Sequence, residues 1–577
     1  MVDIDQSDLE GPKIDRRTTM KLLGAAGVSA SASALAGCTG GSGGEGGDGT
    51  AGEGAKQTGG SVTVGWMIDN IEFLDPHMVG LGEQIEIHSN IFNGLVKLNE
   101  NIEIVGDAAK DWSLPDDTTY VFQLREGITF HNGDTLDAEA VKWSLERLAG
   151  DESLEHHAKM ANVESVEATG EYEVTVNLSK PTAPFISFML RGPGRAGTIV
   201  HKSAADDPDA YNREPVGSGP FKLTGRTSGE SLTLEAYDDY WETDEDGNQL
   251  PYLDKIEIKL IPEPSTLWSA VESGEVAYAN IMTGEFAQQA EGRNDLNVAA
   301  SSAGDWACVA PLTTNPQEVP EQAKYASGYD EVTDKWEGED LPTTDPKVRK
   351  ALSLAIDREE IVEKAWFGYA ETAHALYNPA IGWLYDHLGG DEPDPGQYQD
   401  VERAKQLLDE AGYTGDPRLE FSVLALPEDE REMTVIQEQW REIGVETSLD
   451  IQQESSYWDN IYRYEHTVTT YGGAADVDPW MSDFKQLGTP DPETGMGAWQ
   501  KNLWSNEKFD EAILEATRTP DLDKRAKIYE DAHEAFIEDA PYAMTTFPLN
   551  PKVSTAEFNG VGIQVGLSNF HRAHLSE

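Results

Sequence analysis

YVFQLREGITFHNGDTLDAEAVKWSL, residues 120–145, is the stretch that says most about the fold of this chain. Within it, Gly133 is expected to make a turn in a β-ribbon, because glycine adopts turn conformations without steric cost. Arg125 and Asp134 are expected to make local hydrogen bonds beside that turn. The stretch therefore points to a scaffold, and it identifies no ligand.

Strand and helix patterns alternate along the rest of the chain. Residues 61–68, SVTVGWMI, have the composition of a strand, and residues 445–451 alternate like a half-buried strand. Asp345 and Asp357 are expected to cap helices, and helical apolar spacing recurs over residues 401–411. With no internal repeat, and with a folded part from residue 61 that is too long for one core, the sequence predicts a mixed α/β protein of at least two domains.

The first sixty residues predict an exported, membrane-anchored protein. Arg16 and Arg17 precede an uncharged run, and residues 1–37 are typical of a twin-arginine signal that ends in a lipobox. Cys38 is the expected lipidation site, and residues 38–60 are the expected Gly-rich acidic linker. The predicted location is the outer face of the cytoplasmic membrane; the alternative is that Cys38 is incidental.

The chain is strongly acidic. It has 105 Asp and Glu against 43 Lys and Arg, a formal net charge of −62 that is spread along the whole sequence. Molar salt shortens the Debye length to about 3 Å and screens such repulsion, so the composition indicates a halophilic source. Cationic partners are the alternative. Nucleic acid is not an expected partner, because phosphate contacts need basic patches.

Motifs for catalysis and metal binding are weak. Gly40–Gly44 and Gly192–Gly197 match nucleotide or nucleophile patterns by spacing alone, without the surrounding strand and helix. Residues 242–253 resemble a calcium loop but end in Leu253 where a Glu is required. Cys308, the one cysteine besides Cys38, is expected to be a small buried apolar residue. The sequence therefore predicts no enzyme, no metal site and no cofactor.

Long segments in a fixed order carry a resemblance to a known family. They include residues 74–77 (LDPH), 91–96, 120–145, 214–223, 251–279, 345–370, 404–413 and 508–543. In these segments the chain resembles extracellular solute-binding proteins of family 5, the peptide-binding lipoproteins of ABC importers, here of haloarchaeal type. The resemblance covers nearly the whole mature chain.

The resemblance implies an α/β, periplasmic-binding-protein type II-like fold: two lobes with a hinge, and an extra domain inserted in lobe one. Lobe one would comprise residues 61–104, 215–312 and 545–577, the inserted domain residues 105–214, and lobe two residues 313–544. A monomer is expected to enclose peptide, or another small solute, between its lobes. It would deliver the solute to membrane permease subunits that are powered by a separate ATPase.

By the same resemblance, Asp476 is the candidate that holds the α-ammonium group of a peptide. The spacing to the following Asp-Pro is one residue shorter than in many peptide binders, so Ala475 could occupy that place instead. Asp476 could also be a solvated loop residue or a cap, and Asp478 is expected to cap or turn the chain. The other ligand-binding candidates are the loop of Gly80, Leu81 and Gly82, and Trp306, Trp383, Tyr471, Gly472 and Trp480.

Three functions stay open at this point. The first is capture of di- or oligopeptides for an importer. The second keeps the fold and the transport role but takes an oligosaccharide, a metal chelate or another small solute. The third is a surface sensor or enzyme, which the missing catalytic pattern disfavours.

Overall fold

The computed structural model describes residues 56–577 except 72, 80–81, 193, 303, 329–334, 340, 375, 391–397, 475–476, 565–566 and 577. Arg16, Arg17 and Cys38 of the predicted leader lie outside the described residues, as do the ligand candidates Gly80, Leu81 and Asp476. No helix in the described part of the chain is long and apolar enough to cross a membrane.

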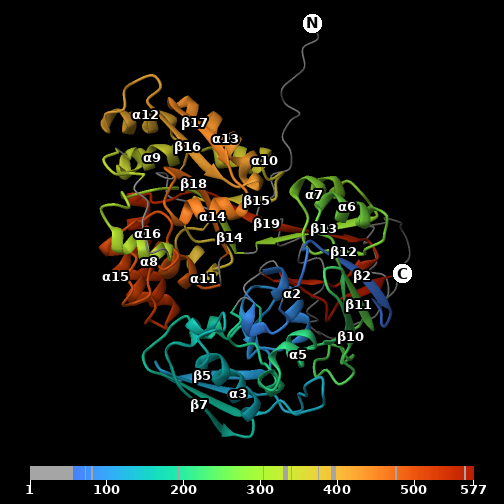
Figure 1. The fold of residues 1–577 in the computed structure, drawn as a ribbon. Helices are drawn as coiled ribbons and strands as arrows, with labels where there is room; N and C mark the ends of the chain where they lie inside the picture. Colours follow the sequence, from blue (N-terminus) through green and yellow to red (C-terminus); the bar gives the residue numbers. More distant parts are fainter. Residues whose placement is uncertain are drawn as a thin grey trace, which may run out of the picture. The chain divides into compact units, whose positions relative to one another are not determined.

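The first lobe is built on a mixed sheet. Its strands are β2 (Ser61–Trp66), β9 (Phe221–Thr227), β10 (Ser231–Ala236), β11 (Lys255–Leu260), β12 (Tyr278–Ala279) and β13 (Leu296–Ser302). β2 runs parallel to β11 and β12, and β9–β10–β11 are antiparallel neighbours. Helices α6 (Pro264–Glu272) and α7 (Gly284–Glu291) pack beside β12 and β13 (Figure 1). The strand predicted from residue 61 is confirmed as β2.

The inserted domain is an antiparallel sheet with a helix. Its strand order is β5 (Ala109–Asp116), β6 (Thr119–Leu124), β8 (Glu173–Leu178) and β7 (Val163–Gly170), and α3 (Ala138–Gly150) packs on it. The turn predicted at Gly133 is confirmed: its φ is +88°, and Thr129 bridges to Thr135 across it. Asp134 accepts from Asn132 Nδ2 at 3.2 Å, one of the expected local hydrogen bonds, whereas Arg125 Nε donates to the carbonyl of Asp107, 18 residues away, at 2.8 Å.

The second lobe repeats the mixture of strands and covering helices. β16 (Leu419–Ala425) is parallel to β17 (Val445–Ile451) and to β18 (Val468–Ala474), while β14 (Asp305–Pro311) is antiparallel to β18. The predicted caps are confirmed. Asp345 accepts a hydrogen bond at the start of α9 (Pro346–Leu354), and Asp357 accepts one at the start of α10 (Arg358–Lys364). Other helices of this lobe are α12 (Val401–Glu410), α13 (Glu430–Glu442), α15 (Glu507–Ala516) and α16 (Leu522–Asp539).

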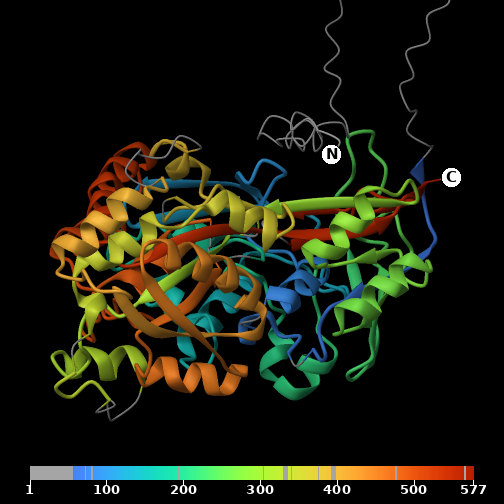
Figure 2. The ribbon, with the colours of Figure 1, turned by 90° about the horizontal axis from the view of Figure 1, so that it is seen from above.

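One long strand, β19 (Ala543–Thr555), belongs to both lobes (Figure 2). Its first residues pair with β14 and with β15 (Ala370–Thr372), and residues 549–555 pair with β13. The chain crosses between the lobes here and again between β13 and β14. The predicted lobe boundaries stay a prediction, although β14, which that division gave to lobe one, pairs with β18 of the second lobe.

A buried ion pair ties β19 to helix α2 (Gly82–Ile91). Lys552 of β19 lies 3.1 Å from Glu86 of α2, and their side chains are 2% and 4% exposed. Glu86 also accepts a hydrogen bond from the backbone N–H of Ser568 at 2.7 Å. Because both charges are removed from water, each depends on the other for compensation.

We expect Glu86→Gln to lower the free energy of unfolding by about 3–5 kcal/mol, because Lys552 would keep a buried charge without a counter-charge. Denaturant unfolding in high salt measures the change. The matched control is Glu275→Gln, which breaks the exposed pair with Lys259 and should cost less than about 1 kcal/mol. Equal losses of unfolding free energy in the two variants would show that the buried pair contributes no more to stability than the exposed pair.

Candidate functional site

The end of β18 (Val468–Ala474) carries two of the ligand-binding residues that the sequence predicted. Tyr471 and Gly472 lie on β18, where Gly472 pairs with Ala307 and Gly473 pairs with Trp306 of β14. The Trp306 ring meets Tyr471 edge-on at 5.6 Å, and both side chains are buried in the core of the second lobe. A Cβ on Gly473 would lie 2.7 Å from a carbon of the Trp306 ring, so this close approach requires glycine.

The segment after β18 is fixed by a buried carboxylate. Asp478 accepts from Arg525 Nη1 at 2.5 Å and from Nη2 at 2.8 Å, a bidentate pair. Asp478 Oδ1 also accepts from the Trp480 N–H at 3.0 Å, so it caps the turn as expected. Arg525, on α16, was missed by the sequence analysis because 47 residues separate the partners. The one sign of Arg525 in the sequence was its position in residues 508–543, a segment that carries the family resemblance.

Two tryptophans, Trp480 and Trp383, contact this pair of residues. Trp480 stacks on Phe484 at 5.9 Å and meets Phe188 of the inserted domain edge-on at 5.1 Å. Trp383 lies under the Arg525 guanidinium, which is 5.4 Å from its ring centroid. Both rings are partly buried, so they are available for apolar contact as well as for packing.

A second buried carboxylate, Asp483, lies in the π-helix η7 (Met481–Leu487). It accepts from the Tyr377 hydroxyl at 3.0 Å. Burial raises the pKa of Asp483 well above its ordinary 3.8, and the nearby charge of Asp478 adds to the effect. The region therefore holds one charged carboxylate, Asp478, beside one that favours its neutral form.

Asp483 should make the protein less stable as pH rises. The folded state favours its protonated form, so its stabilisation is present below the unfolded pKa near 3.8 and is lost as pH rises through the raised folded pKa. We expect Asp483→Asn, which stays neutral, to be more stable than the parent at pH 7, with the difference shrinking toward pH 4. Guanidinium chloride unfolding at both pH values measures this. Asp239→Asn, at an exposed position, is the matched control, and a variant destabilised equally at both pH values would contradict the argument.

On the first lobe, the residues before the predicted ligand loop are firmly held. Asp75 accepts from Arg147 Nη2 at 2.6 Å and from the His77 N–H at 3.0 Å, and it is fully buried. Burial lowers the pKa of His77 to about 4, so its ring is neutral near pH 7. The chain then reaches Gly82, the first residue of α2. The ligand-binding role of the loop between these residues and α2 stays a prediction.

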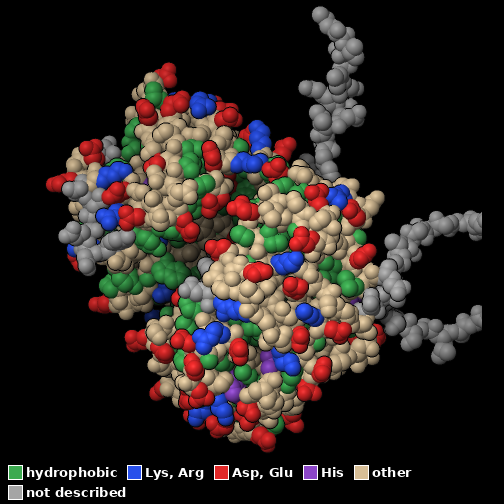
Figure 3. Space-filling model, turned by 45° about the vertical axis from the view of Figure 1, so that its right-hand side comes forward, with side chains coloured by type: hydrophobic (Ala, Val, Ile, Leu, Met, Phe, Trp, Pro, Cys, Tyr) green, Lys and Arg blue, Asp and Glu red, His purple; other side chains and the backbone are tan. Residues whose placement is uncertain are grey.

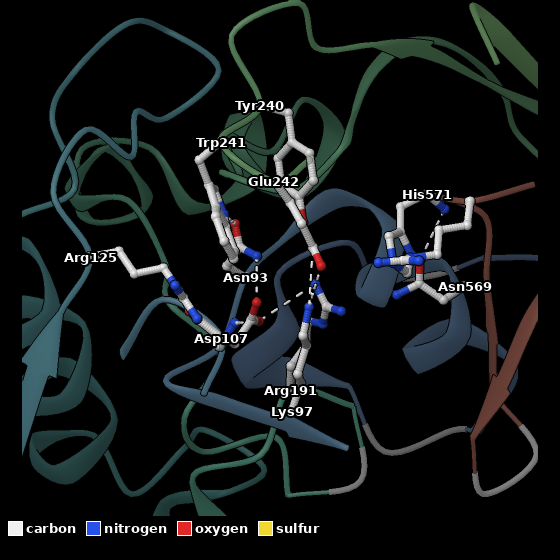
Figure 4. A network of polar contacts seen from close by, with 12 residues as sticks. Asn93, Lys97, Asp107, Arg125, Arg191, Tyr240, Trp241, Glu242, Asn569 and His571 are labelled. Carbon is white, nitrogen blue, oxygen red and sulfur yellow. Dashed lines mark hydrogen bonds and ion pairs between the residues drawn. The ribbon is translucent and has the colours of Figure 1, made fainter. Parts of the chain in front are cut away.

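Another charged cluster is structural (Figure 4). Asp107 accepts from Asn93 Nδ2 at 2.9 Å and from the Gly94 N–H at 2.8 Å, and it pairs with Arg191 at 3.5 Å. Next to it Lys97 pairs with Glu242 at 3.0 Å. These charges compensate one another, which leaves little capacity for a ligand. The cluster joins the inserted domain to the first lobe.

The structure also describes Cys308 and the acidic loop 242–253, two features that the sequence analysis discussed. Cys308 is buried, as expected, and burial raises the pKa of its thiol well above the ordinary value. In the acidic loop 242–253, Asp244 accepts hydrogen bonds from Tyr252 and Asn248 of the same loop. Among the described residues, no group of three or more His, Cys, Asp or Glu side chains is arranged to hold a metal ion.

The surface view shows where a solute could be taken up. The face in Figure 3 is hollowed near its centre, and hydrophobic side chains line parts of the hollow, while acidic and basic side chains are scattered over the outer surface. A recess with apolar walls and few polar groups is the usual form of a small-molecule site. The arrangement suits binding of a solute, and the residue contacts assigned from the sequence stay predictions.

Comparison with known proteins identifies the class. Residues 103–495 match the family described as bacterial extracellular solute-binding proteins, family 5 middle, and the chain belongs to this family. The fold is that of a type II periplasmic binding protein with two lobes, as predicted. The description of this family is of proteins that bind solutes.

Individual relatives agree in length and fold. The chain is 25% identical over 521 residues to the oligopeptide-binding protein AppA of Bacillus subtilis, covering 86% of this chain and 88% of AppA. It is also 25% identical to the nickel-binding periplasmic protein of Escherichia coli, covering 87% and 91%. The structure of DppA from Helicobacter pylori in complex with the peptide STSA is 23% identical, with a TM-score of 0.69, covering 90% and 99%.

Proposed function

We propose that this chain captures di- or oligopeptides between its two lobes and delivers them to the permease of an ABC importer. The observation that carries the proposal is the segment after β18, where Asp478 is paired to Arg525 and the candidate Asp476 lies two residues before it. A carboxylate can form a charge-assisted hydrogen bond with an ammonium group. The relatives that bind oligopeptide or carry a bound peptide support this ligand class.

Metal chelates and other small solutes are the second candidate. The nickel-binding relative is as similar to this chain as the oligopeptide-binding one, at 25% identity over most of both proteins. Oligosaccharides belong to the same candidate group, because the scaffold does not fix the ligand. In this case the aromatic side chains Trp383 and Trp480 would supply the walls of the site, and Asp476 would have no ammonium group to bind.

The cellular setting is also a proposal. Arg16, Arg17 and Cys38 support export by a twin-arginine signal, followed by lipid anchoring on the outer face of the cytoplasmic membrane. The net charge of −62 supports a salt-rich, haloarchaeal setting. The chain would act as a monomer that meets its permease at the membrane surface.

A thermal-shift screen tests the ligand class. The chain, purified in molar salt, is heated with separate pools of peptides, oligosaccharides and metal chelates. A ligand that binds only the folded state stabilises it, by about 2.7 kcal/mol at a concentration of one hundred times Kd. We expect a raised melting temperature with peptides.

The variant Asp476→Asn should lose most of the peptide-induced shift, because it removes the charge opposite the ammonium group. Asp239→Asn, which removes the same charge from an exposed position, should keep the whole shift. A shift with chelates or sugars and none with peptides would replace the peptide assignment. A peptide shift that survives in Asp476→Asn would keep the ligand class and reject the residue.

A further inference from the structure

Residues 477–480 touch two separate parts of the chain at once. Val477 is 8% exposed and is buried in the apolar core cluster of the inserted domain. Trp480 packs against the same cluster, with its ring edge-to-face with Phe188 at 5.1 Å and an interplanar angle of 70°. Both residues nonetheless follow β18 of the second lobe. This short segment therefore contributes apolar surface of one lobe to the core of the other.

The base of the segment is held in the second lobe. Between its two apolar residues lies Asp478, which binds the guanidinium of Arg525 through both carboxylate oxygens. Arg525 is itself flanked by the rings of Trp383 and Tyr529, at 5.4 and 5.6 Å. A planar guanidinium gripped in this way has a fixed orientation, so it fixes the direction in which Val477 and Trp480 project.

A backbone hydrogen bond reinforces the same junction. The Ala183 N–H, just before α4 (Phe185–Phe188) of the inserted domain, donates to the carbonyl of Thr517 at 2.8 Å. Thr517 is the C-cap of α15 in the second lobe. Helix α4, which carries Phe188, is thus placed against the second lobe by a contact independent of the aromatic pair.

We propose that residues 477–480 form a latch, meaning a segment that holds the inserted domain and the second lobe together. Asp478 and Arg525 are the positioning residues that fix its orientation. The proposal rests on the proposed function, because it takes the two lobes to close around a solute. When the lobes meet, the apolar residues dock on the Phe188 cluster. When they part, the same segment is released from one side.

The size of the effect follows from the contact. An edge-to-face aromatic pair changes an equilibrium constant by a factor of about 2–10 beyond the area that it buries. Loss of Trp480 should therefore shift the balance between the closed and open arrangements by about tenfold toward open. Because Phe188 is the partner, its loss should give a similar shift, and the double variant should add little.

Small-angle X-ray scattering of the ligand-free chain tests the latch. We expect Trp480→Ala and Phe188→Ala each to increase the radius of gyration in molar salt, with no further increase in the double variant. The matched control is Trp268→Ala, which removes a ring stacked on Phe286 at 5.5 Å inside the first lobe. It should lower the melting temperature without changing the radius. Circular dichroism and a cooperative melt establish that each variant is folded.

The variant Arg525→Lys is a second test, this time of the ion pair that holds the segment in the second lobe. It keeps the positive charge but loses the bidentate geometry. We expect it to expand the chain as Trp480→Ala does. If folded Trp480→Ala and Phe188→Ala both keep the radius of the parent, the latch is overturned, whether or not peptides bind. If the radius increases but no peptide raises the melting temperature, the latch stands and the proposed ligand class fails.

Discussion

The connection between the two lobes depends on one strand, β19, which takes part in the sheet of each lobe. Its first residues complete the sheet of the second lobe and its last residues complete that of the first, through pairing with β14, β15, β13 and β12. A slip of one residue would exchange the two faces of the strand, so its register is fixed by the cores on both sides. The chain also crosses between the lobes from β13 to β14, so two crossings lie next to each other in the sheet.

Buried ion pairs occur at the junctions of this chain. Lys552 and Glu86 join β19 to α2, Arg147 and Asp75 join α3 to the residues before α2, and Arg525 and Asp478 hold the segment after β18. Surface repulsion in so acidic a protein varies with salt, whereas buried pairs are screened much less. The junctions are therefore held by interactions that stay nearly constant while the surface responds to its solvent.

Much of the scaffold could be predicted from local patterns. Asp345 and Asp357 cap helices because a short acidic side chain reaches the free N–H groups of the first turn, and that chemistry is local in sequence. The pairs that hold the junctions could not be predicted. Glu86 and Lys552 are 466 residues apart, and nothing in the sequence near either residue indicates the other. For the site, the sequence placed Asp478 in a capping turn but gave no reason to expect Arg525 beneath it.

The same long-range contacts bear on how a solute is held. Residue 473 must be glycine for β18 to lie against the Trp306 ring, and Asp478 is held by Arg525, so the short stretch between them is bounded by two fixed points. In general, a segment with fixed ends loses less conformational entropy when a ligand binds to it than a free loop does. The two supports here come from the core of the second lobe and from α16. Supports of this kind are separate from the groups that contact a ligand, so one scaffold can present different ligand-binding groups.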